Sequence, residues 1–196
     1  STVTLSGYTV TGVNAVTWNS DDLLFYAIIK VNPNPSRRLV KINPATGVCT
    51  DIGPLAGNFS SLTYNSTSGI LYTIGGAGSG SYSERIYSLN LSNAQETFLG
   101  GPYSVGADGE VIAFNYDDGF IYHWSGNVTA NMEKINPSTF VATPVTQSGV
   151  SHREIWGAVY IGGNTFTATD INFNAYNISS SGVVSSQFVG IGSDAI

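Results

Sequence analysis

The feature that most constrains the fold is a fourfold internal repeat with a period of about 45 residues. Each copy contains four short runs rich in apolar and aromatic residues, separated by Asn, Asp, Gly and Ser. The third run always ends in an asparagine, and these asparagines lie 47, 46 and 41 residues apart: Asn43, Asn90, Asn136 and Asn177. Four short strands per repeat at this spacing are typical of a β-propeller blade.

The repeat predicts an all-β, four-bladed β-propeller with four antiparallel strands per blade and an extra N-terminal strand. We expect a single domain over residues 1–196, with the N-terminal strand at 1–12 and blades at about 14–54, 60–100, 110–147 and 156–190. The first strand of each blade is more apolar than the fourth. This difference fits a first strand near the axis and a fourth strand at the rim.

The N-terminal strand has three possible roles, because the last blade already contains a fourth strand. It could close the ring as an extra edge, or it could pair with the sheet edge of a neighbouring subunit. Alternatively, the chain could be one portion of a larger ring, with residues 193–196 beginning another blade. Pairing between subunits would give rings or filaments, and its contact residues would be Val3, Leu5 and Tyr8.

Composition narrows the class of protein. Only 10% of residues are charged and the net charge is −6, which argues against a nucleic-acid binder. No apolar run is long enough for a transmembrane helix, and no segment resembles a signal peptide, which suggests a mature or excised chain. The low charge and abundant uncharged polar residues favour an extracellular or cell-surface location. Cys49 is the only cysteine, so we expect it to be a packed side chain.

The densest group of chemically active residues is the segment His152-Arg153-Glu154-Ile155-Trp156. An aromatic plate beside hydrogen-bond donors and a carboxylate could hold a sugar. Alternatively, the Arg and Glu could pair while the Trp packs between blades. Four further residues are expected on the same loop face: Tyr82, Asp108, Glu110 and Trp124. As a third alternative, Glu154 could form an acid–base pair with Asp108 or Glu110.

No metal or cofactor is expected. The acidic pairs at 21–22 and 117–118 lack the alternating spacing of a calcium loop and are interpreted as turns. His123 and His152 lie far apart without partners at zinc-ligand spacing. The glycine-rich segment 75–80 lacks the lysine of a phosphate-binding loop.

Five Asn-x-Ser/Thr sequons are candidates for N-glycosylation, and all five are expected in turns or loops. They begin at Asn58, Asn65, Asn90, Asn127 and Asn177. Asn90 and Asn177 could equally serve only as turn residues.

The segments at residues 42–47, 64–72 and 132–139 resemble blades of secreted microbial β-propeller repeat proteins, a group with kelch-like and quinoprotein-like members. The resemblance implies the fold and an extracellular setting. It transfers no catalytic residues, because the shared motifs are turns and strands. The double glycine of kelch repeats is not present in every copy, and the WD40 signals are missing.

We therefore expect a non-enzymatic, extracellular structural or adhesion module. It would self-assemble as a homo-oligomer or homopolymer, including filaments, through the N-terminal strand and exposed blade edges. The alternative is a lectin-like, carbohydrate-binding propeller that uses the loop face around Trp156. A glycoside hydrolase is a distant third hypothesis.

Overall fold

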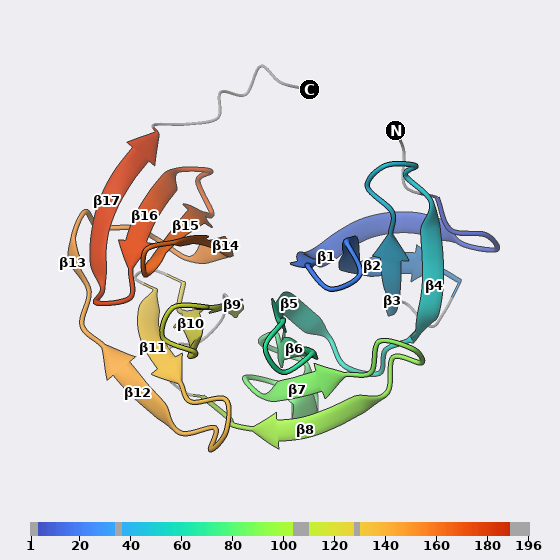
Figure 1. The fold of residues 1–196 in the computed structure, drawn as a ribbon, viewed down its shortest axis with the longest axis horizontal. Coiled ribbons are helices and arrows are strands. Elements are labelled where there is room, and N and C mark those ends of the chain that lie inside the picture. The colour runs from blue at the N-terminus through green and yellow to red at the C-terminus, as the bar shows by residue number, and fades with distance from the viewer. Residues whose placement is uncertain (1–3, 34–36, 104–109, 128–129, 189–196) are drawn as a thin grey trace. The chain divides into compact units, whose positions relative to one another are not determined.

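The computed structural model describes residues 4–33, 37–103, 110–127 and 130–188. The chain divides into two compact units, residues 1–100 and 101–196, and each is described by itself. The described residues form four antiparallel sheets, which are the blades of a four-bladed β-propeller, as predicted (Figure 1). Their one helical turn is a 3-10 turn at Gly80–Tyr82, so no helix among them could cross a membrane.

Unit 1 contains two four-stranded meanders, in which each strand pairs with the next along the chain. Sheet 1 consists of β1 (Thr9–Asn19), β2 (Leu24–Asn32), β3 (Arg37–Ile42) and β4 (Cys49–Pro54). Sheet 2 consists of β5 (Phe59–Asn65), β6 (Ile70–Gly75), β7 (Ile86–Leu89) and β8 (Glu96–Gly100).

Unit 2 repeats this pattern and adds one short strand. Sheet 3 consists of β9 (Val111–Phe114), β10 (Ile121–Ser125), β11 (Asn131–Ile135) and β12 (Ala142–Val145). Sheet 4 consists of β14 (Ile155–Gly162), β15 (Thr165–Asp170), β16 (Ala175–Ser179) and β17 (Val183–Phe188). The fifth strand of this sheet is β13 (Ser148–Gly149), which pairs in parallel with β17.

The described part of the N-terminal segment does not form the separate strand expected at 1–12. Residues 9–12 are the beginning of β1 and pair with β2. Before them, Leu5 and Tyr8 form only an isolated bridge across a tight turn. The sequence suggested a separate strand because residues 4–7 precede the first blade much as residues 50–53 precede the second, but β2 is long enough to pair with β1 through to Thr9.

The repeated asparagines fold the hairpins locally. The side-chain oxygen of Asn43 accepts hydrogen bonds from the backbone N–H groups of Ala45 and Thr46. This Asx turn reverses the chain without distant contacts. The same turn recurs after the first and third strands at Asn19, Asn65, Asn90, Asn115 and Asn136. Asn177 differs from this prediction: it lies within β16, paired with Thr167 and Ser185, and the turn follows at residues 180–182.

In unit 1, sheets 1 and 2 pack face to face. Tyr26, Ile28 and Leu39 of sheet 1 share a buried cluster with residues of sheet 2, notably Leu62, Tyr64 and Leu71. On the other face of sheet 1, Leu5 packs over β2 and β3 in a smaller cluster. The N-terminal segment therefore covers part of sheet 1 of its own chain.

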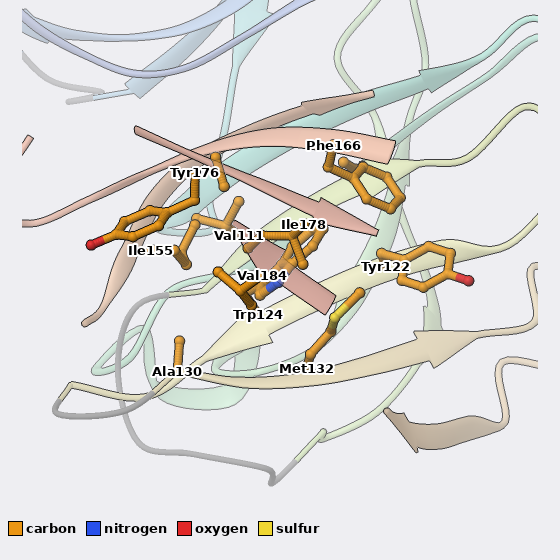
Figure 2. Packing of buried hydrophobic residues seen from close by; sticks show 12 residues of the cluster. Val111, Tyr122, Trp124, Ala130, Met132, Ile155, Phe166, Tyr176, Ile178 and Val184 are labelled. Carbon is orange, nitrogen blue, oxygen red and sulfur yellow. The ribbon is translucent and has the colours of Figure 1, made fainter. Parts of the chain in front are cut away.

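In unit 2, sheets 3 and 4 enclose the second core. Trp124 of β10 is completely buried, and its ring contacts Phe166 of β15 edge to face at 5.1 Å. Figure 2 shows Tyr122, Met132 and Ile178 directed into the same cluster. Burial of this many large side chains is the main force that holds the two sheets together.

Candidate ligand-binding site

Two loops of unit 2 lie side by side at one end of sheet 4. β14 begins where β15 ends, because Ile155 pairs with Asp170. The N–H of Ile171 donates to the carbonyl oxygen of Glu154 at 2.9 Å, which joins the loop before β14 to the turn after β15. Between them lies a cavity of about 380 Å³, lined by residues 151–153, Asp170, Asn172, Asn174 and Tyr176.

Asp170 organises the turn on one side of this cavity. Its carboxylate is almost completely buried and accepts four hydrogen bonds within unit 2. The donors are the N–H groups of Asn172 and Asn174, the Asn174 side-chain amide and the Tyr176 hydroxyl. Burial opposes ionisation, but these bonds outweigh it and lower the pKa of Asp170 below its ordinary value. The turn is therefore held by a charged carboxylate that is fully engaged.

This turn presents Phe173 to solvent. Phe173 adopts a positive φ of 61°, a left-handed conformation that is uncommon for a bulky residue. Its side chain is 58% exposed, and Trp156 beside it is 54% exposed. The two rings meet edge to face, with centroids 5.9 Å apart. Phe173 on this strained turn and Trp156 on β14 thus form an exposed aromatic pair, which makes them candidates for ligand contact.

His152 forms part of the lining of this cavity. One ring nitrogen, Nδ1, donates to the Arg153 carbonyl oxygen at 2.9 Å, and Nε2 lies 2.7 Å from the side-chain oxygen of Gln147. Its ring packs on Tyr176, with centroids 5.7 Å apart. His152 is thus nearly buried and fixed by its neighbours, so its role here is to position the loop that carries Arg153.

Arg153 and Glu154 do not form an ion pair, which was one of the alternatives offered by the sequence. No such pair occurs within the described residues. Arg153 is exposed at the cavity, and Glu154 instead accepts the indole N–H of Trp156 at 3.0 Å. That bond orients the Trp156 ring, which is largely exposed.

The predicted site is therefore assembled only in part. His152 and Arg153 line the cavity, Glu154 accepts a hydrogen bond from Trp156 beside it, and Trp124 is a core residue with no exposed surface. A Trp before a glycine-containing loop looked accessible in sequence, whereas β10 extends one residue beyond it and points the ring into the core. Asp108 lies outside the described residues.

Tyr82 lies in unit 1, where it packs against Phe59 and Tyr87. Burial raises the pKa of its hydroxyl, with Glu96 adding to the effect. Its contacts within the described part of unit 1 are those of an aromatic packing residue. The order of strands and loops in the sequence suggested that Tyr82 lies on a loop face with residues 152–156. That order does not indicate which side chains are buried.

Glu110 is buried in a charged cluster with His123 and Glu133. The two ring nitrogens of His123 face the two carboxylates: Nδ1 lies 2.8 Å from Glu133, and Nε2 bonds Glu110. Ser125 donates to the second oxygen of Glu110 at 2.9 Å. Burial alone would lower the pKa of His123, but the two carboxylates outweigh it and raise the pKa to about 9. Glu110 therefore neutralises a buried imidazolium, which argues against the third alternative, an acid–base pair with Glu154.

Two of the three residues expected to mediate assembly make contacts within their own chain. Leu5 is 6% exposed and lies in the core of its own sheet 1. Tyr8 lies under the guanidinium of Arg38, 4.7 Å from its ring centroid. Val3 lies outside the described residues. Leu5 and Tyr8 thus both make contacts within their own chain.

The five sequons occupy different environments. Asn65 is 5% exposed at the end of β5, and its side chain is used in an Asx turn. Asn177 lies inside β16, contrary to the expected loop position. Asn90 and Asn127 are exposed, and Asn58 is half-buried.

The missed residues of the site are Asp170, Asn172, Phe173 and Asn174. The alternation Asp-x-Asn-x-Asn over 170–174 is a sequence signal that could have located this turn. The exposure of Phe173 had no such signal, because it depends on the positive φ of that residue.

A family model described as a repeat of unknown function (DUF6923) matches residues 1–184. The chain belongs to this family. The family's description agrees with the fourfold repeat, and the more specific likeness to secreted kelch-like or quinoprotein-like proteins stays a prediction. No curated protein matches this DUF6923 chain.

Two solved structures from Bacteroides thetaiotaomicron VPI-5482 share the fold. One, described as a structural genomics protein of unknown function, is 16% identical with a TM-score of 0.66, over 92% of this chain and 48% of its own. The other, described as an auxiliary nutrient binding protein, is 14% identical with a TM-score of 0.60, over 95% of this chain and 49% of its own. The DUF6923 chain thus spans about half the length of these structures.

Proposed function

We propose that this chain is an extracellular carbohydrate-binding module whose ligand stacks on Trp156 and Phe173. The observation that carries the proposal is the exposed contact between Trp156 and Phe173, on a turn whose residues Asn172 and Asn174 line a polar cavity. The apolar C–H face of a sugar ring packs on flat aromatic side chains. The cavity volume of about 380 Å³ falls within the range of small-molecule sites, roughly 300–1,000 Å³.

The polar lining suits hydroxyl groups. Asn172, Ser151 and Arg153 are exposed at the cavity. An amide both donates and accepts hydrogen bonds, as a hydroxyl does, which makes Asn172 a good partner for a sugar. Asp170 already accepts four bonds from the protein, so it supports the turn and leaves ligand contacts to its neighbours.

Local charge favours a neutral sugar. Asp170 and Glu154 carry two formal negative charges beside the single positive charge of Arg153. The whole chain has a net charge of −6, which also disfavours acidic ligands. The similar structure described as a nutrient-binding protein supports a binding role as a starting hypothesis.

An array of neutral and acidic glycans tests the proposal. We expect wild-type chain to bind neutral glycans, and Trp156→Ala to bind them roughly tenfold more weakly or worse, which corresponds to about 1.4 kcal/mol. Phe98→Ala is the matched control, because Phe98 is 53% exposed in unit 1. Binding that is absent in wild type, or equal in wild type and Trp156→Ala, would show that the proposal is wrong.

Two further variants separate stacking from polar recognition. Asn172→Ala leaves the backbone bond to Asp170 in place and removes only the side-chain amide. We expect a few-fold loss of affinity, smaller than that of Trp156→Ala. Arg153→Gln removes the only cation of the lining among the described residues. A preference for acidic glycans that this substitution abolishes would overturn the choice of a neutral ligand.

Self-assembly, the first expectation from the sequence, stays a prediction. Leu5 is buried on its own sheet and Tyr8 is engaged with Arg38, so they do not support the expected route through the N-terminal strand. A different surface of the chain supports association between copies.

A further inference from the structure

Sheet 1 exposes apolar side chains on the face that points away from sheet 2. Val16 and Trp18 are two residues apart on β1, and Trp18 pairs with Phe25 of β2, so the three share one face. They are 57%, 39% and 36% exposed. Leu5 covers a neighbouring part of this face but leaves these three uncovered. We call Val16, Trp18 and Phe25 the first-sheet face.

Comparison with the equivalent positions of sheet 2 shows how such a face is used in the fold. In sheet 2, Asn65 forms the same Asx turn as Asn19 in sheet 1, so the two sheets can be aligned on these residues. The positions equivalent to the first-sheet face are then Leu62, Tyr64 and Leu71. These residues are 5%, 3% and 0% exposed, because sheet 1 packs on them. The first-sheet face is thus the kind of surface that a preceding sheet covers in sheet 2. Within the described part of unit 1, no sheet precedes sheet 1 along the chain.

Sheet 4 has the complementary surface. Its inner face packs on sheet 3, whereas Val159 of β14 lies on the opposite face and is 58% exposed; Ile161, in a bulge of the same strand, is 53% exposed. Val159 pairs with Thr167, which lies on that same face. In sheet 3 the corresponding first-strand residues, Val111 and Ala113, are buried against sheet 4. We call Val159, Ile161 and Thr167 the last-sheet face.

We propose that the first-sheet face of one copy packs on the last-sheet face of a second copy, so that two copies associate head to tail. This contact continues the sheet-on-sheet packing found inside each unit. Neither β1 nor β14 contains a charged residue, so the two first strands can approach without burying a charge of their own. Exposed apolar surface of this kind marks interaction sites in soluble proteins.

Two copies form the smallest assembly in which head-to-tail contacts leave neither face uncovered. Each copy then contributes its first-sheet face to one contact and its last-sheet face to the other. The occupant of each face is therefore a second copy of this chain.

Light scattering on the full chain tests the proposal. We expect wild type at twice the monomer mass of 20.6 kDa. Val16→Glu and Val159→Glu each place a charge in one face, and we expect both to weaken association at least tenfold. Val48→Glu is the matched control at 59% exposure, and we expect it to remain dimeric. Circular dichroism checks that each variant folds.

Mixing the two charge variants tests the head-to-tail arrangement itself. A Val16→Glu copy still offers an intact last-sheet face, and a Val159→Glu copy an intact first-sheet face. We expect the equimolar mixture to recover dimers through one unmodified contact. A monomeric wild type, a larger particle, or a charge variant that stays dimeric would overturn the proposal.

Discussion

The buried cluster around His123 makes the stability of the chain depend on pH in a defined direction. In the folded chain its pKa is raised from the ordinary 6.5 to about 9 by Glu110 and Glu133, although burial opposes the charge. A difference of about 2.5 between the folded and unfolded pKa values corresponds to about 3 kcal/mol. His123 is completely buried, so solvent screens this interaction little.

Because folding raises the pKa of His123, the folded state binds its proton more tightly than the unfolded state. The full contribution is therefore present below pH 6.5, and it is lost as the pH rises from 6.5 through about 9. The free energy of unfolding should fall by about 1.4 kcal/mol per pH unit within this window.

Urea unfolding followed by circular dichroism at intervals between pH 6.5 and about 9 measures this slope. His123→Gln removes the titrating ring, so the variant should be less stable at low pH and should lack the fall. Glu133→Gln removes one carboxylate and should reduce the fall in the free energy of unfolding. Lys134→Gln is the control, because Lys134 lies next to Glu133 on β11 but its ammonium group packs over the Phe120 ring. Equal slopes in wild type and His123→Gln would refute the assignment of a charged imidazole.

Other positions test the local structure. Leu23 has a positive φ of 58° and is 62% exposed, so Leu23→Gly should raise the free energy of unfolding by about 1 kcal/mol. Gly119 has a φ of 76° with open space around it, so Gly119→Ala should lower it by about the same amount in the same urea assay. Leu5→Ala should cost about 2 kcal/mol because Leu5 packs in the core of sheet 1. In a glycosylating host, peptide mass spectrometry should find Asn65 unmodified, since its side chain is buried in a turn.

The fold could be predicted from the sequence because the hairpin turns are formed by local interactions. Asn43, Asn90 and Asn136 each bond their own backbone two residues ahead, so the pattern of short strands could be read directly. Asn177 broke the pattern, because its place inside β16 is set by pairing with β15 and β17. Pairing with β2 likewise extended β1 back to Thr9, beyond the strand length that the repeat suggested.

The candidate site was predictable only where its residues are contiguous. Segment 152–156 was found as a cluster, but Asp170 and Phe173 join it through the pairing of β14 with β15. Trp124 and Glu110 were misjudged because residue type does not indicate which face of a strand is buried. His123 looked isolated in sequence, and only the fold places Glu110 and Glu133 at its two nitrogens.

The most direct test of the proposed binding role is saturation-transfer NMR with the neutral glycan that gives the strongest array signal. Saturating the aromatic protons should transfer magnetisation to the C–H protons on one face of the sugar ring. This transfer should be much weaker in Trp156→Ala and unchanged in Phe98→Ala. Transfer of equal strength in Trp156→Ala and wild type, or none in wild type, would contradict stacking of a sugar on the exposed aromatic pair.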